Sequence, residues 1–80
     1  MRDEDERVDA ILTGMRYDRK IHVIKLVREV TGLALAEAKD FIEHLPQTLK
    51  RDISIEEGWE LRGRFGDLGA QVNTRPSSRP

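Results

Sequence analysis

A short stretch in the first half of the chain mixes positively charged and apolar side chains in a way that suits protein binding. It contains Lys20, Ile21, Ile24, Lys25 and Arg28. Isoleucine side chains gain free energy when a partner buries them, and lysine and arginine attract an acidic surface. Nucleic-acid bases would favour stacking on aromatic rings, and this stretch has no phenylalanine, tyrosine or tryptophan. The residue types therefore predict a contact surface for an acidic protein partner.

The sequence offers no comparable signal for catalysis. Neither His22 nor His44 has a serine, a cysteine or a second metal ligand at a catalytic spacing. The chain has no cysteine, which excludes a disulfide scaffold, a thiolate metal site and a cysteine nucleophile. Gly63, Gly66 and Gly69 fall inside or at the end of a predicted helix, so they do not indicate a phosphate-binding loop. We expect a protein that is not an enzyme and that uses no cofactor or metal.

Length and charge narrow the class of protein further. Eighty residues allow one small domain. The formal net charge of -1 gives no general attraction to a polyanion, although the N-terminus is acidic and the segment from Arg16 to Arg28 is basic. No apolar run is long enough for a signal peptide or a membrane span, so we expect a cytoplasmic chain without membrane contact.

Two helices joined by a short turn must position the charged stretch. Lys20–Thr31 has helical spacing, and Gly32 stands where a glycine ends a helix. Leu35–Leu45 forms a second helix that stops before Pro46. Because few residues join the two helices, we expect a helical hairpin. The second helix should turn these apolar side chains toward the core: Leu35, Ala38, Phe41, Ile42 and Leu45.

Helical geometry separates the two isoleucines. Each helical residue advances about 100° around the axis. The core stripe of the first helix consists of Val23, Leu26, Val27 and Val30. Ile21 lies among the cations outside this stripe and should be exposed, whereas Ile24 lies at its edge, where core packing and partner contact are equally open. Lys39 of the second helix also has two interpretations, because it either extends the basic surface or pairs with Glu43 one turn further on.

The remaining elements complete a small α+β domain. Val8–Met15 fits helical and strand spacing, so its conformation stays open. Thr48–Ile53 and Ala70–Asn73 are candidate strands. If the first element is also a strand, the order is β-α-α-β-α-β, with helices on one face of a three-stranded sheet. The domain would span residues 8–73, between a disordered acidic N-terminus (1–7) and a disordered tail (74–80).

The third helix carries an unexpected tryptophan. Ser54 and Glu57 have the spacing of a capping box and open a helix that runs to about Leu68. Trp59 points away from the core side of this helix, at an angle close to two glycines. Either the ring covers those glycines and supports a weak helix, or Trp59 and Arg62 form a second contact site. The glycines of this helix are Gly58, Gly63 and Gly66.

The stretch KIHVIKLVREVTGLALAEAKDFIEHLP resembles the C-terminal domain of the bacterial ribosomal large-subunit stalk protein. That family reads approximately K-[IV]-x-V-I-K-x-V-R-x-x-T-G-L-G-L-K-E-A-K-D-x-V-E-x-x-P. The match is ungapped from Lys20 to Pro46 and continues more loosely through Ser54 and Leu61 to about Asn73. The resemblance implies a β-α-α-β-α-β fold with a three-stranded antiparallel sheet.

The resemblance also implies a function. In that family the domain recruits translational GTPases, including elongation factors Tu and G, to the ribosome. The contact surface is the first helix, the turn and the start of the second helix. The family's contact positions correspond here to Lys20, Ile21, Ile24, Lys25, Arg28 and Lys39.

Four departures from the family pattern bear on these expectations. Ala34 replaces a usual glycine and would be strained if its φ were positive. Ala36 replaces a usual lysine and so removes a positive charge. The three glycines of the third helix replace good helix formers, at a cost of roughly 1 kcal/mol each relative to alanine. The family's N-terminal dimerisation domain and hinge have no counterpart in these residues, and without them we expect no anchoring to the ribosome in the usual way.

Two other functions compete with the binding of translational GTPases. A helix-turn-helix DNA-binding domain is disfavoured because the second helix, which would enter the major groove, is mainly acidic. Its charged residues are Glu37, Lys39, Asp40 and Glu43. A repurposed interaction domain with a partner outside translation is suggested by Trp59 and by the missing lysine at Ala36.

Overall fold

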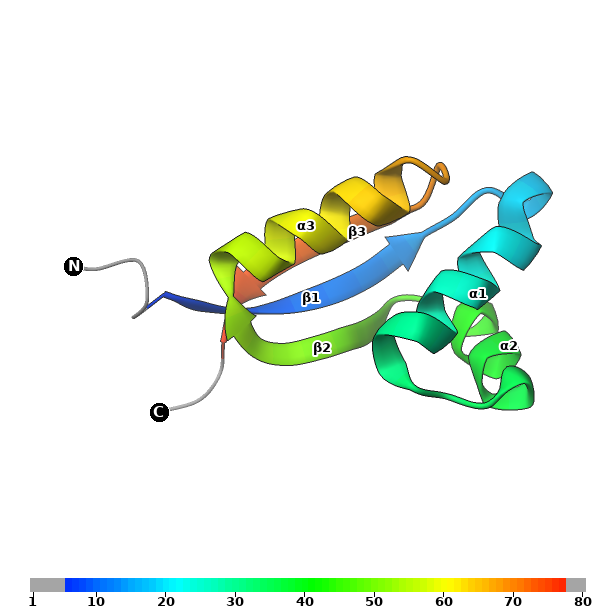
Figure 1. The fold of residues 1–80 in the computed structure, drawn as a ribbon, viewed down its shortest axis with the longest axis horizontal. Helices are drawn as coiled ribbons and strands as arrows, with labels where there is room; N and C mark the ends of the chain where they lie inside the picture. Colours follow the sequence, from blue (N-terminus) through cyan, green and yellow to red (C-terminus); the bar gives the residue numbers. More distant parts are fainter. Residues whose placement is uncertain (1–5, 78–80) are drawn as a thin grey trace.

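The computed structural model describes residues 6–77 and shows a three-stranded antiparallel sheet with helices packed against it (Figure 1). The order β-α-α-β-α-β confirms the predicted α+β fold, with one short 3-10 helix added before the first α-helix. The elements are β1 (Arg7–Gly14), the 3-10 helix η2 (Tyr17–Arg19), α1 (Lys20–Thr31), α2 (Leu35–Glu43), β2 (Gln47–Ser54), α3 (Ile55–Gly66) and β3 (Gln71–Pro76).

β1 is the central strand of the sheet, in the order β2-β1-β3. Its residues Val8, Ala10 and Leu12 are all buried in the hydrophobic core. Side chains of a strand alternate between the two faces of a sheet, so these three share the face that the helices cover. The conformation that the sequence left open for Val8–Met15 is therefore a strand, which ends at Gly14.

The helices divide between the length of the sheet and one of its ends. Figure 1 shows α3 running alongside β1 and β3, while the α1–α2 hairpin lies at the end of the sheet where β1 finishes. Val23 and Val27 of α1, Leu12 of β1 and Phe65 of α3 are all fully buried in one core cluster. This shared core fixes the position of the hairpin relative to the sheet.

Specific hydrogen bonds fix the point where α1 ends and the point where α3 begins. Gly32 has φ of +79°, and its N–H donates to the carbonyl of Arg28 at 2.8 Å, which confirms the predicted glycine stop of α1. Ser54 caps α3, because its Oγ accepts a hydrogen bond from the N–H of Glu57 at 3.1 Å. The carboxylate of Glu57 contacts Lys50 Nζ at 3.0 Å.

Several element boundaries differ from the sequence-based expectation. α2 ends at Glu43 and not at Leu45, and β2 is one residue longer at each end than expected. Arg7, expected in the disordered N-terminus, begins β1. α3 ends at Gly66 and is followed by a turn, so the helix is shorter than the predicted one. Residues 74–76, expected in the tail, belong to β3, where Thr74 pairs with Ala10 and Pro76 with Val8. The backbone N–H and C=O groups of a central strand need hydrogen-bond partners along its whole length. Because backbone pairing does not depend on apolar side chains, the hydrophobic pattern of the sequence does not reveal it. The predicted disorder of residues 1–5 and 78–80 lies outside the described residues.

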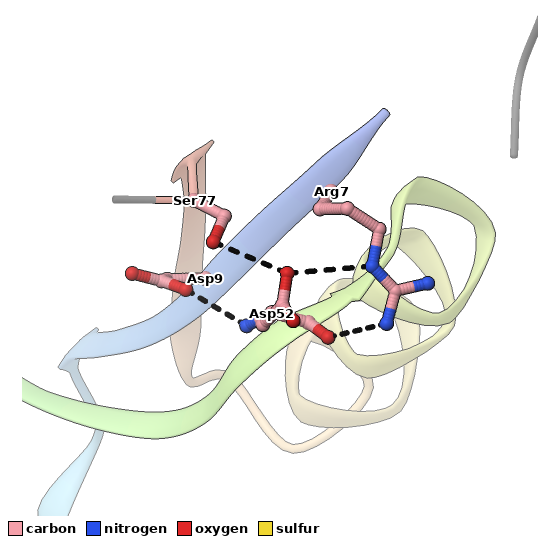
Figure 2. A network of polar contacts seen from close by, with 4 residues as sticks. All are labelled: Arg7, Asp9, Asp52 and Ser77. Carbon is pink, nitrogen blue, oxygen red and sulfur yellow. Dashed lines mark hydrogen bonds and ion pairs between the residues drawn. The ribbon is translucent and has the colours of Figure 1, made fainter. Parts of the chain in front are cut away.

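A bulge interrupts the pairing of β1 with β2 at a buried aspartate. Asp9 faces two residues of β2, Arg51 and Asp52, so β2 carries one extra residue at this point. Asp52 has φ of +56°, and its N–H donates to Asp9 Oδ1 at 2.9 Å (Figure 2). Arg7 Nη2 donates to the carbonyl of Asp52 at 2.6 Å, and Ser77 Oγ lies 3.2 Å from Asp52 Oδ1. Side chains from β1, from β2 and from the residue after β3 therefore hold the bulge in place.

Candidate protein-binding surface

α1 exposes a stripe that combines one apolar and two basic side chains. Ile21, Lys25 and Arg28 follow one another at intervals of four and three residues, so they share one face of the helix. All three are exposed, and 79% of Ile21 is accessible to solvent. The structure thus brings together three of the residues that the sequence singled out.

Ile24 does not belong to this exposed stripe. Only 6% of it is accessible, and it is part of the hydrophobic core cluster. Of the two interpretations that the sequence left open, core packing is the one that the structure supports. Because the side chain is covered by its own domain, we leave Ile24 out of the exposed surface, and its contact with a partner stays a prediction.

α2 contributes Lys39 and, unexpectedly, Leu35. Leu35 was expected in the core because it follows the same apolar spacing as Ala38 and Ile42, but 46% of it is accessible. It is the first residue of α2 and lies at the edge of the buried arc. Leu35 and Lys39 are four residues apart and therefore share one side of the helix. The sequence signal for its exposure was its position at the very start of the helix.

Two polar contacts link α1 to the turn and to α2. Lys20 Nζ lies 3.9 Å from Glu43 Oε2, at the point where α1 begins and α2 ends. Arg28 Nε donates to the carbonyl of Leu33 in the turn, at 3.4 Å. Glu43 therefore pairs with Lys20 and not with Lys39, which one interpretation of the sequence had suggested. We refer to the following side chains as the α1–α2 surface: Lys20, Ile21, Lys25, Arg28, Leu35 and Lys39.

Positive charge dominates this surface because neighbouring carboxylates have other partners. Glu29 forms an ion pair with Arg64 of α3, and its hydrogen bond and charge raise the pKa of that guanidinium. Glu37 Oε1 accepts the N–H of Ala34 at 3.0 Å. Among residues 6–77, no carboxylate lies within ion-pair distance of Lys25 or Lys39. These two ammonium groups are available to an acidic partner.

The turn between the helices is not strained by its alanine. Ala34 has φ of -70° and ψ of 163°, which is extended backbone open to any residue. The residue with positive φ is Gly32, two positions earlier. Ala36 is exposed on α2, so its effect is limited to the lysine charge that it does not carry. The turn therefore keeps the geometry needed to join the two helices.

Trp59 and Arg62 lie on α3 and not on the α1–α2 surface. Both are exposed, with 55% of Trp59 accessible to solvent. Apart from the flanking residues and the backbone of α3 itself, no described atom lies within 4 Å of a Cβ built on Gly63 or Gly66, so the tryptophan ring does not cover either glycine at contact distance. Gly58 differs, because a Cβ there would lie 3.0 Å from Thr74 Cγ2. Close packing of α3 on the sheet accounts for Gly58 alone.

The histidines form no catalytic arrangement. His22 is exposed on α1, and His44 caps the end of α2. His44 Nδ1 lies 2.9 Å from the carbonyl of Asp40, and this hydrogen bond, with the charge of the Asp40 carboxylate, raises the pKa of His44 above 6.5.

Within residues 6–77 no three acidic, histidine or cysteine side chains cluster as a metal site would require. In the same range no helix has the length and apolar character needed to cross a membrane.

Comparison with known proteins gives a consistent assignment. The sequence model of the ribosomal protein L7/L12 C-terminal domain matches residues 8–75. The chain is 42% identical over 73 residues to the large ribosomal subunit protein bL12 of Bacillus licheniformis, covering 91% of this chain and 58% of that protein. It is 44% identical over 68 residues to the bL12 protein of Mycoplasma genitalium, covering 85% and 56%. The chain thus spans less than two thirds of the length of these relatives. It belongs to the family of the ribosomal protein L7/L12 C-terminal domain.

Proposed function

We propose that this chain binds translational GTPases of the elongation factor Tu and G class through the α1–α2 surface. Membership in the L7/L12 family links the domain to translation. The proposal adds the class of partner and the residues that contact it. It places the chain at the ribosomes of the cytoplasm, and it involves no small-molecule substrate, cofactor, nucleic acid or membrane.

The exposed side chain of Ile21 is the observation that carries the proposal. An isoleucine that is 79% accessible contributes little to the core of its own domain. Burying such a side chain at an interface is worth roughly 1.5–3 kcal/mol. Its neighbours on the helix are Lys25 and Arg28, so an apolar anchor stands beside positive charge.

The charge of the surface specifies the chemistry of the partner. Lys25 and Lys39 are exposed and available, while Arg28 holds the turn with one nitrogen and leaves the rest of its guanidinium exposed. Such cations steer an acidic partner and speed association more than they add affinity. Leu35 adds a second exposed apolar side chain. The best partner is therefore a helix or groove with acidic residues around an apolar centre.

A titration followed by NMR tests the proposal directly. Elongation factor Tu or G is added to the ¹⁵N-labelled chain, and we expect the signals of Ile21, Lys25 and Lys39 to shift or broaden at micromolar factor. Lys25→Glu should weaken binding strongly, because it reverses a charge at the surface. Arg75→Glu is the matched control, since Arg75 is an exposed cation on β3. Unchanged α1 signals at high micromolar concentrations of both factors would contradict the proposal.

A second candidate function rests on Trp59. An exposed tryptophan is a favoured anchor of protein interfaces, and Arg62 lies three residues further along the same helix. These two residues would support a partner outside translation. Pull-down from native cytosol separates the two functions, because Trp59→Ala and not Lys25→Glu should then weaken retention of the partner.

A further inference from the structure

A hollow of about 270 Å³ lies next to the α1–α2 surface, where β1, η2 and the end of α2 meet. The apolar side chains Met15, Ile42 and Leu45 line it. Thr13, Tyr17, Lys20 and Glu43 also line it and contribute polar groups. Lys20 is therefore a member of both the hollow and the α1–α2 surface.

Tyr17 is exposed to an extent that core packing does not explain. With 82% of the residue accessible, it is more exposed than Ile21, and η2 contains no buried residue. The turn that carries it is held in place, because the Arg16 guanidinium donates to both carboxylate oxygens of Asp18 at 3.1 and 2.9 Å. The N–H of Arg19 also donates to the carbonyl of Arg16 at 3.1 Å. An aromatic ring on a short, hydrogen-bonded turn loses little conformational entropy when it binds a partner.

The hollow borders the α1–α2 surface at Lys20, which directly precedes Ile21 in the chain. Tyr17 and Ile21 are four residues apart, and Lys20 stands between them at the start of α1. The two side chains are the most exposed of the large apolar residues in the described part of the chain. A partner helix that covers Ile21 can present a second apolar side chain one turn away, because residues three or four apart share a helix face.

We propose that the hollow receives one apolar side chain of the acidic partner helix and that Tyr17 closes over it as a second anchor. The inference rests on the proposed function, since the partner is the same translational GTPase. Lys20 is balanced here by Glu43 at 3.9 Å, so Arg19 supplies the positive charge beside the hollow. With Lys25 and Arg28 further along α1, this charge fits an acidic helix with two apolar residues one turn apart. Tyr17 would thus determine specificity together with Ile21.

Binding of elongation factor G to single variants tests the role of Tyr17. We expect Tyr17→Ala to raise the Kd about tenfold, as loss of an interface anchor does. The matched control is Trp59→Ala, which removes an exposed aromatic side chain from α3 and should change the Kd less than twofold. Because Tyr17 is exposed, we expect the Tyr17→Ala variant to fold like the wild type. Circular dichroism checks this expectation.

A methyl NMR titration tests the hollow itself. The methyl signals of Met15 and Ile42 should move when the factor binds, whereas that of Ile55, at the other end of β1, should not. Unmoved Met15 and Ile42 signals, or a Tyr17→Ala variant that binds like the wild type, would overturn the inference. If Lys25→Glu still abolishes binding in that case, the proposed function is supported and only the inference about the hollow and Tyr17 fails. If the wild-type chain binds neither factor, both fail together.

Discussion

The carboxylate of Asp9, with 1% of the residue accessible, accepts a hydrogen bond of 2.9 Å from the backbone N–H of Asp52. Asp52 is one of the two bulge residues of β2 that face Asp9, and it has a positive φ. A bulge leaves one backbone group without a partner in the ladder, and here a side chain of the central strand supplies that partner. The other carboxylate oxygen of Asp9 faces Arg51 Nη1 at 3.8 Å. The buried aspartate therefore serves the fold and not the binding surface.

Asp9→Ala should lower the free energy of unfolding by about 2 kcal/mol, because the partly buried N–H of Asp52 then loses its acceptor. Asp9→Asn keeps an acceptor oxygen and should cost about half as much. Urea unfolding followed by circular dichroism measures both. An alanine variant as stable as the wild type would show that water or another group can satisfy the Asp52 N–H.

The two isoleucines of α1 should separate binding from stability. Ile21→Ala removes an exposed side chain, so we expect the free energy of unfolding to change by less than about 0.5 kcal/mol. Ile24→Ala leaves a cavity in the core and should cost about 2–4 kcal/mol. Urea unfolding gives the stability, and titration with elongation factor G gives the affinity, which should fall for Ile21→Ala. Equal losses of stability in the two variants would contradict the assignment of Ile21 to the surface.

The glycines of α3 should respond to alanine with opposite signs. Gly63→Ala places its Cβ in open space and should raise the free energy of unfolding by about 0.5–1 kcal/mol through better helix propensity. Gly58→Ala places its Cβ 3.0 Å from Thr74 Cγ2 and 3.1 Å from Val8 Cγ2. Both neighbours are β-branched and have restricted χ1, so we expect a net loss of about 1 kcal/mol. Thermal and urea unfolding would reveal a stabilised Gly58→Ala variant, which would contradict the close approach of α3 to the sheet.

His44 should titrate above the ordinary histidine pKa of 6.5. The first cause is the hydrogen bond to the Asp40 carbonyl and the second is the charge of the Asp40 carboxylate. Because the pKa is higher in the folded state, the stabilisation is fully present below the unfolded pKa and is lost as the pH rises through the folded pKa. An NMR titration of the His44 ring measures the folded value.

Asp40→Asn is the control for the titration of His44. It removes the carboxylate charge but leaves the backbone carbonyl, so the pKa of His44 should fall only part of the way to its ordinary value. A wild-type pKa at or below 6.5 would show that the contact with Asp40 is not formed in solution.

Patterns among neighbouring residues were enough to predict the helices of the hairpin and most of the side chains that they expose. Val23, Leu26 and Val27 have the spacing of one helix face, and Gly32 ends that helix at a position where only glycine adopts positive φ easily. Such features depend on residues close in the sequence. The same patterns placed Ile21 outside the core and identified Lys25, Arg28 and Lys39 as exposed cations, as the structure has them.

Tertiary structure alone decided the features that depend on distant residues. Ile24 and Leu35 both lie at the edge of an apolar stripe, and only the packing of α1 against α2 and the sheet buries one and exposes the other. The strand at 74–76 exists because β1 needs a backbone partner there, and Asp9 is buried because a bulge some forty residues later requires an acceptor. The hollow beside Tyr17 likewise forms only where β1, η2 and α2 meet. A sequence records the preferences of neighbours, whereas burial and pairing depend on which distant surfaces the fold brings together.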